Sequence, residues 1–372
     1  MVYQFILFLS FFQGLLFLGH WVLYKNLIRF SIFGNPSAIL ALKIGLGLAS
    51  IGFLVSSLLA FRFGNFLVRF LYYISAAWLG TFFYLAVSAA FLWMFFAFSG
   101  QSFEQGNLRI LGIVLLCVAA AVSFYGLINA RTLRVQKLEI AFSNLPPQWE
   151  GKTAVFFSDT HLGPVWQNKF SGKVVKLIND FQPAVVFMGG DFYDGGSAVN
   201  PETLAEPFSK LKSVYGTYFV TGNHDEIGDG SSHLAALRNI GFKILSDEMV
   251  DLNGLQVGGA SYKNFRGDTN FSELLDKMNF NPSKPRILLK HVPSNIAEVR
   301  EAGISLMLSG HTHRGQIFPL SFITKWVYGG YDVVLSFLGN TAFFTSDGVG
   351  TWGPPMRVGS GSEIAVITFR KK

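Results

Sequence analysis

The residues best suited to chemistry lie in short polar clusters, each directly after an apolar run that is typical of a buried strand. Every cluster holds a carboxylate, an amide or an imidazole, the side chains that bind metal ions in proteins. In chain order the clusters are residues 158–161, 189–191, 222–225, 290–291 and 310–313. Together they contain five of the seven histidines in the chain. One arrangement repeated five times indicates a metal site with several ions rather than a set of chance turns.

The ligand types and their spacing indicate which ions bind and what they do. Asp, His and Asn without Cys suit divalent Mn, Fe, Zn, Ni or Mg, of which we expect Mn. Asp159 and His161 are two residues apart, as are His311 and His313, so an extended backbone directs both members of each pair to one side. Two ions about 3.5–4 Å apart polarise a phosphoryl group and make hydroxide available near neutral pH. The single cysteine, Cys117, lies in an apolar run and excludes a disulfide framework or a thiolate site.

The elements that position these clusters alternate between strand and helix patterns. The apolar runs predict strands over residues 153–157, 184–188, 217–220, 286–289 and 305–308. Amphipathic patterns predict helices over residues 167–181, 201–213, 232–240 and 294–302, and alternation around Asn253-Gly254 predicts a hairpin over 249–260. This is an α/β layer architecture, in which reactive side chains gather beyond the carboxyl ends of the strands.

The charge distribution divides the chain into a membrane part and a second part with the composition of a water-soluble domain. Residues 1–130 hold only seven of the 53 charged side chains, which excludes a soluble single domain. Apolar stretches at residues 2–24, 39–61, 71–98 and 110–129 predict four transmembrane helices. We therefore expect a helix bundle over 1–130, a juxtamembrane strand and linker over 131–150, and a catalytic domain over 151–372. Only His20, near the end of the first stretch, is a candidate for the buried ionisable groups of an ion pathway, so an anchor is favoured over a transporter.

Basic residues near the predicted helix ends indicate the orientation. Five lie on the side of the catalytic domain and at most four on the opposite side, which favours a multi-pass protein of the cytoplasmic (inner) membrane with its catalytic domain in the cytoplasm. The five are Arg62, Arg69, Arg131, Arg134 and Lys137, and the four are Lys25, Arg29, Lys43 and Arg109.

The five clusters also carry a resemblance to a known family. In order they read Asp-x-His, Gly-Asp-x-x-Asp, Gly-Asn-His-Asp, a lone His and Gly-His-x-His, and they resemble the motif set of the calcineurin-like metallophosphoesterase superfamily over residues 152–315. The sequences at 310–316 and 350–355 are similar to a membrane-associated bacterial branch, which includes transmembrane proteins with a metallophosphoesterase domain and some UDP-2,3-diacylglucosamine hydrolases. The resemblance implies a four-layer αββα metallophosphoesterase sandwich, here preceded by a four-helix transmembrane bundle.

The resemblance also implies a role for each site residue. One divalent ion is bound by Asp159, His161, Asp191 and His313. The second is bound by Asp191, Asn223, His291 and His311, so that Asp191 bridges the two ions. His224 lies near the leaving group as a general acid or hydrogen-bond donor, and Asp225 orients it. Asp194 is either a partner of the ligands or a solvated turn residue, and Arg314 is either a phosphate contact or part of the scaffold.

The substrate class is less constrained than the reaction class. Residues 131–372 carry 24 basic and 22 acidic side chains, a balance that disfavours nucleic acid. The membrane anchor and the apolar segment 317–344, either a lip that contacts the bilayer or a core hairpin, indicate a phosphorylated or nucleotide-linked lipid. UDP-2,3-diacylglucosamine is a candidate implied by the resemblance alone. The alternatives are a phosphodiesterase for soluble esters with the helices as anchor only, and a non-catalytic membrane sensor or scaffold.

Overall fold

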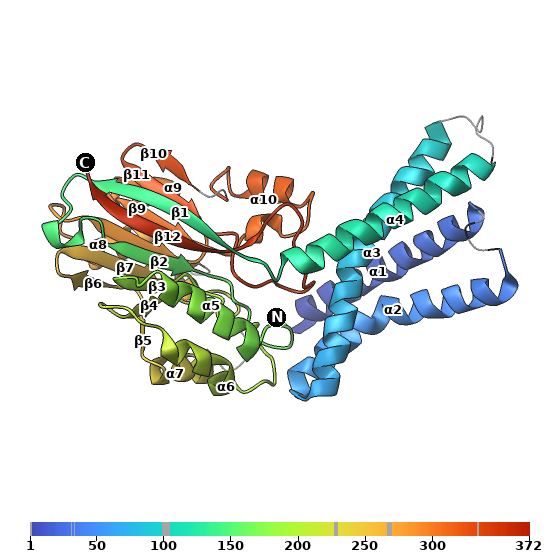
Figure 1. Ribbon diagram of the computed structural model, residues 1–372, viewed down its shortest axis with the longest axis horizontal. Coiled ribbons are helices and arrows are strands. Elements are labelled where there is room, and N and C mark those ends of the chain that lie inside the picture. The colour runs from blue at the N-terminus through green and yellow to red at the C-terminus, as the bar shows by residue number, and fades with distance from the viewer. Residues whose placement is uncertain are drawn as a thin grey trace. The chain divides into compact units, whose positions relative to one another are not determined.

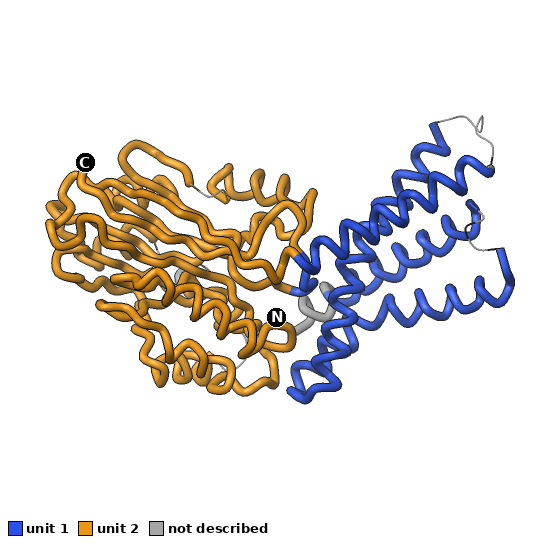
Figure 2. The backbone as a smooth tube through the Cα atoms, in the orientation of Figure 1, with its two compact units in different colours: residues 1–128, 353–356 blue, residues 129–352, 357–372 orange. Residues whose placement is uncertain are grey.

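The computed structural model divides the chain into two compact units. It describes residues 2–30, 32, 34–98, 105–226, 230–265, 270–332 and 335–372. Unit 1 comprises residues 1–128 with 353–356, and unit 2 comprises residues 129–352 with 357–372 (Figure 2).

Long helices make up unit 1. They are α1 (Val2–Arg29), α2 (Pro36–Arg62), α3 (Phe66–Phe98) and α4 (Gln105–Asn129), the last residue of which belongs to unit 2. In the described part of the chain, three helices are long and apolar enough to cross a membrane: Pro36–Arg62, Phe66–Phe98 and Gly106–Asn129. The prediction of four spans is therefore too high by one. The predicted span at residues 2–24 does form a helix, α1, but α1 is not among these three.

His20 has a packing role in unit 1. The Trp78 indole Nε1–H can only donate and lies 3.0 Å from His20 Nε2, so the second ring nitrogen, Nδ1, donates to the Leu16 carbonyl oxygen at 2.7 Å. The ring stacks on Phe82 with a centroid separation of 3.7 Å. Both ring nitrogens are thus hydrogen-bonded within the bundle, which supports the interpretation of these helices as an anchor.

Unit 2 contains two mixed β-sheets. Within the described residues each sheet has six strands, in the orders β1-β12-β2-β3-β4-β5 and β10-β11-β9-β8-β7-β6 (Figure 1). The first sheet consists of β1 (Leu133–Phe142), β2 (Thr153–Phe157), β3 (Val185–Met188), β4 (Thr217–Phe219), β5 (Phe242–Ile244) and β12 (Ser362–Lys371). The second consists of β6 (Glu248–Leu252), β7 (Leu255–Ala260), β8 (Arg286–Lys290), β9 (Leu306–Ser309), β10 (Ser336–Leu338) and β11 (Thr341–Thr345).

Helices cover the outer face of each sheet. One apolar cluster joins the first sheet to α5 (Asn168–Asp180), α6 (Pro201–Ala205) and α7 (Gly230–Asn239). Another joins the second sheet to α8 (Phe271–Lys277) and α9 (Ile296–Glu301). The core between the sheets contains Phe156, Phe187, Leu289 and Leu308, all fully buried. Short 3₁₀ helices complete the unit: η1 (Pro147–Trp149), η2 (Glu206–Lys210), η3 (Tyr262–Phe265) and η4 (His313–Gly315). The predicted four-layer αββα sandwich is confirmed.

The strand directions bring the polar clusters to one edge. Strands β2, β3 and β4 run parallel to one another, as do β7, β8 and β9. The five predicted strands are confirmed, as are the hairpin at Asn253-Gly254 and the helical segments between them. The long strand β12 was not predicted. It pairs with β1 in parallel over ten residue pairs and with β2 in the opposite direction, and these partners are distant in sequence.

The segment 317–344 contains both a buried strand and an exposed helix. Strand β11 is buried throughout and pairs with β9 and β10, as a core hairpin would. Helix α10 (Ser321–Val327) behaves differently, because none of its seven residues, all of them described, is buried.

Trp149 ties the linker after β1 to both sheets. Its side chain is fully buried, its ring stacks on Tyr215 with centroids 4.7 Å apart, and its Nε1–H donates to the Leu252 carbonyl of β6 at 2.8 Å.

We expect Trp149→Phe to lower the free energy of unfolding by about 1–3 kcal/mol, because the buried Leu252 carbonyl loses its donor. Urea unfolding of the full-length protein in detergent measures this difference. Trp326→Phe, at an 83 % exposed site, is the control and should change stability by about 0.5 kcal/mol or less. Equal effects of the two substitutions would contradict the assigned role.

Candidate metal centre

The loops that follow β2, β3, β4, β8 and β9 carry all of the predicted ligands. Five of these residues have a positive φ, a backbone conformation that non-glycine residues rarely adopt. They are Asp159 (55°), His161 (43°), Asp191 (54°), His311 (71°) and His313 (47°). Left-handed backbone costs about 1–3 kcal/mol per residue and persists where the surrounding structure enforces it, typically at functional sites. Here it turns side chains from different loops toward common points.

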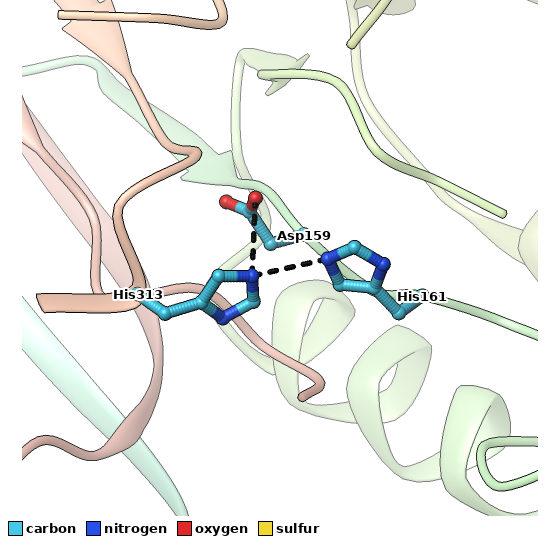
Figure 3. Close-up of side chains that lie close together, drawn as sticks. All are labelled: Asp159, His161 and His313. Atoms are coloured by element: carbon cyan, nitrogen blue, oxygen red, sulfur yellow. Dashed lines mark hydrogen bonds and ion pairs between the residues drawn. The ribbon is translucent and has the colours of Figure 1, made fainter. Parts of the chain in front are cut away.

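One group of side chains consists of Asp159, His161 and His313 (Figure 3). His161 Nε2 lies 3.0 Å from His313 Nε2, and His313 Nε2 lies 3.6 Å from Asp159 Oδ1. The Asp159 carboxylate also accepts the His311 backbone N–H, at 3.0 Å from Oδ1. Burial raises the pKa of Asp159, although the charges of His291 and His161 oppose this shift. The three side chains come from β2 and β9 loops that are about 150 residues apart in sequence.

A second group consists of Asp191, His291 and His311. His291 Nδ1 lies 2.7 Å from the Gly189 carbonyl oxygen, to which it donates, so its Nε2 faces the centre. That nitrogen is 3.2 Å from His311 Nδ1 and 3.3 Å from Asp191 Oδ2. Burial disfavours the charged forms of both His291 and Asp191. The attraction between the two side chains outweighs this effect, because the pKa of His291 is raised to about 9 and the pKa of Asp191 is lowered well below its usual range.

Asp191 connects the two groups. Its Oδ2 lies 3.3 Å from His291 Nε2 and 3.7 Å from His161 Nε2, and its Oδ1 accepts the His224 backbone N–H at 2.8 Å. Asn223, the remaining predicted ligand, has a buried Oδ1 with no hydrogen-bond partner in the described part of the chain. The structure therefore brings six of the seven predicted ligands together in two groups, Asp159, His161 and His313 in one and Asp191, His291 and His311 in the other, with Asp191 close to both.

These distances and donor types fit divalent ions. Two ligand atoms that are each about 2.0–2.2 Å from one ion lie about 3–3.5 Å apart. The nitrogen–nitrogen separations of 3.0 and 3.2 Å match this value. In the second group, His291 Nε2 is the ring nitrogen that faces the Asp191 and His311 side chains, and the unpartnered Asn223 oxygen is an additional acceptor. Buried acceptors that face one another are unfavourable unless a cation or proton lies between them.

Asp225 does not orient His224, so that part of the prediction is wrong. Its fully buried carboxylate accepts four backbone N–H groups, those of Asp191, Phe192, Tyr193 and Gly222, at 2.8–3.2 Å. Burial raises the pKa of Asp225 to about 7, and these hydrogen bonds oppose the shift. Asp225 instead holds the loop after β3 in the conformation that places Asp191.

Asp194 takes the position beside His224. Its Oδ1 lies 3.9 Å from His224 Nδ1 and 3.5 Å from His161 Nδ1, the ring nitrogen opposite the Nε2 that faces His313. Its side chain is largely buried, which excludes the solvated turn considered for it. The His224 ring is near an exposed aromatic residue, Trp352, with centroids 5.9 Å apart. Arg314 is half-buried, and its charge acts on buried Asp347.

Arg357 is a residue of the centre that the motifs did not indicate. Its guanidinium is fully buried, and Nη2 lies 3.1 Å from His313 Nδ1. The same nitrogen donates to the carbonyl oxygens of Asp347 and Gly350, each at 2.6 Å. Burial, with the charges of His161 and Arg357, lowers the pKa of His313 well below its usual range and keeps its imidazole neutral. A single arginine 44 residues after its histidine gives no local sequence signal.

Arg357 should contribute to stability through the several N–H donors of its guanidinium group as well as through its charge. We expect Arg357→Lys to lower the free energy of unfolding by about 1.5–3 kcal/mol, the value of a hydrogen bond from a charged group, and to reduce metal content. Urea unfolding and elemental analysis of the full-length protein in detergent measure the two effects. Arg370→Lys is the matched control, because Arg370 is 46 % exposed and its 3.0 Å ion pair with Glu139 should contribute about 1 kcal/mol or less. A smaller loss for Arg357→Lys than for this control would disprove the expectation.

Comparisons with known proteins agree with this geometry. Residues 152–315 match the family model described as calcineurin-like phosphoesterase. The chain is 31 % identical over 307 residues to an uncharacterized metallophosphoesterase of Campylobacter jejuni, covering 78 % of each protein. It is 32 % identical over 292 residues to a transmembrane protein with metallophosphoesterase domain of Bos taurus, covering 73 % of this chain and 65 % of that one.

An uncharacterized metallophosphoesterase of Helicobacter pylori is 34 % identical over 221 residues, and the chain spans 60 % of the length of that relative. The match in Campylobacter jejuni extends over most of both proteins. With the five motifs and the αββα sandwich, these similarities lead to one conclusion: the chain belongs to the calcineurin-like phosphoesterase family.

Proposed function

We propose that this protein is a membrane-anchored hydrolase with two divalent ions that cleaves a phosphoester or pyrophosphate bond in a lipid or lipid precursor. UDP-2,3-diacylglucosamine is the candidate substrate, and manganese is the candidate metal. The observation that carries the proposal is the position of Asp191 Oδ2, which is 3.7 Å from a histidine nitrogen of one ligand group and 3.3 Å from a histidine nitrogen of the other. From this position Asp191 would hold both ions.

The residues of the chain divide the work of the reaction. Two divalent ions supply Lewis acidity toward a phosphoryl group and lower the pKa of a coordinated water. His224 lies outside both ligand groups, and its ring contacts His161 edge-on with centroids 4.8 Å apart. Burial lowers the pKa of His224, whereas Asp191 and Asp194 raise it by stabilising the protonated form. In this position the imidazole can donate a proton or a hydrogen bond to the leaving group.

The lipid substrate rests on the connection between α4 and unit 2. Only residues 130–132 separate the end of α4 from β1, a distance of at most about 14 Å. Since residues 106–129 have the length and composition of a membrane span, the catalytic unit remains at the bilayer surface, where lipid headgroups are concentrated. This tether favours a lipid over the soluble esters considered as an alternative.

We also infer that the catalytic unit lies in the cytoplasm, with the helices in the inner membrane. The α2–α3 connection and the start of β1 are on the same side of the bilayer if α3 and α4 both span it. This side carries Arg62, Arg69 and Arg131, together with Arg134 and Lys137, and cytoplasmic loops are enriched in such residues.

A pair of substitutions separates metal binding from proton donation. We expect His224→Asn to retain the metal and lose about 10²–10⁴-fold in turnover, because it removes only the donor. Asp191→Ala should lose metal content as well as turnover. Elemental analysis and hydrolysis of a chromogenic aryl phosphodiester by the full-length protein in detergent measure both quantities. Loss of metal from His224→Asn equal to that from Asp191→Ala would assign His224 to the ligands instead.

The substrate is tested by release of UMP from UDP-2,3-diacylglucosamine in detergent micelles with added manganese. We expect release that disappears on chelation and in Asp191→Ala. If the aryl phosphodiester is cleaved while the lipid is not, the reaction class stands and this substrate is rejected. If neither is cleaved by protein that contains metal, the sensor alternative is favoured.

A further inference from the structure

Helix α10 has the opposite polarity to that of a helix on the surface of a soluble domain. Its apolar residues point to solvent: Phe322 is 65 % exposed, Ile323 57 %, Trp326 83 % and Val327 56 %. These four residues are called the α10 apolar face. The polar residue Thr324 is turned toward unit 2, where its hydroxyl donates to the buried carboxylate of Asp332 at 2.7 Å. Helices normally bury the apolar side and expose the polar one, so this arrangement needs an apolar partner.

The start of α10 is linked to the end of a membrane-spanning helix through contacts within unit 2. The Phe318 ring contacts Phe322 of α10, with centroids 5.7 Å apart. The Phe318 backbone N–H donates to the Val358 carbonyl at 2.8 Å. The preceding residue, Arg357, accepts a hydrogen bond at its carbonyl from the Asn129 side chain at 3.0 Å, and Asn129 is the last residue of α4.

These contacts place α10 close to the bilayer surface. Residues 106–129 form a helix of about 36 Å, long enough to cross a hydrocarbon core of about 30 Å, so Asn129 lies at the membrane–water interface. The Asn129 side chain also donates to the Ser360 carbonyl at 2.9 Å, and its Oδ1 accepts from Arg134 at 2.6 Å. The Asn129 side chain is therefore hydrogen-bonded within the same part of unit 2 that carries Phe318.

The composition of α10 matches this environment. A tryptophan with phenylalanine, isoleucine and valine suits the boundary between headgroups and acyl chains, where aromatic rings are enriched. Lys325, which is exposed between them, suits the phosphate groups of anionic lipids. Acidic residues are absent from this seven-residue helix.

We propose that α10 is a membrane-docking helix, with the α10 apolar face inserted at the level of the lipid headgroups and upper acyl chains. It gives the catalytic unit a second attachment to the bilayer besides α4. Because η4, which contains His313, ends only five residues before α10 begins, this attachment presents the metal centre to the lipid surface. Docking goes beyond the proposed hydrolysis and does not depend on which ester is cleaved.

The test measures the depth of α10 in a bilayer without any use of activity. Full-length protein with Cys117→Ala and one new cysteine, Trp326→Cys or Ile323→Cys, is labelled with a nitroxide and placed in phosphatidylethanolamine–phosphatidylglycerol nanodiscs. Collision rates with oxygen, which concentrates in the bilayer, and with a water-soluble nickel complex report the environment of the label. Val214→Cys is the matched control, because Val214 is an 81 % exposed apolar residue of the same unit.

We expect the ratio of oxygen to nickel collisions to be inverted between the two kinds of site: oxygen should dominate at positions 323 and 326, and nickel at 214. Ratios at 323 and 326 equal to that at 214 would overturn the proposal. Labels shielded from both reagents, with spin–spin broadening that vanishes on dilution with unlabelled protein, would also overturn it and assign the face to a second copy of the chain. Unchanged cooperative unfolding of each labelled variant establishes that the fold is intact.

Discussion

The burial of carboxylates and imidazoles at one edge of the two sheets is the constraint on which the rest of this structure depends. Asp159, His161, Asp191 and His291 are almost completely removed from solvent, yet each is polar and two of them form an ion pair. Such groups are stable only when every lone pair and proton has a partner. The loops supply some of these partners, for example the Gly189 carbonyl for His291. Divalent ions supply the remainder.

The surrounding backbone is shaped to let the loops approach one another. A Cβ on Gly310 would overlap the Asp159 carboxylate, and a Cβ on Gly222 would overlap that of Asp191. Asp225 gathers the backbone N–H groups of two loops onto one carboxylate, and Arg357 donates to two carbonyl groups of the segment after β11. Left-handed residues are strained, and this network of buried hydrogen bonds maintains their conformations.

The end of α4 is joined to the rest of unit 2 by hydrogen bonds as well as by the chain. Three helices have the properties of membrane spans, and the last of them ends in Asn129, whose side chain is bound within unit 2. Only three residues lie between α4 and β1, too few to form a long flexible linker. An outward-facing apolar helix near a metal centre is unfavourable in water, whereas contact of its apolar face with lipid is favourable.

The sequence by itself determined the strand ends and the ligand types, because each depends on a local pattern: an apolar run, a polar stop and a histidine or aspartate at fixed spacing. It also predicted the family and the αββα layers. Only the tertiary structure decided what Asp225 binds, since its partners include N–H groups more than 30 residues away. The same holds for Arg357, for the pairing of β12 with β1, and for the outward face of α10. A periodic pattern shows that a helix has two faces, but contacts from distant segments decide which of them is covered.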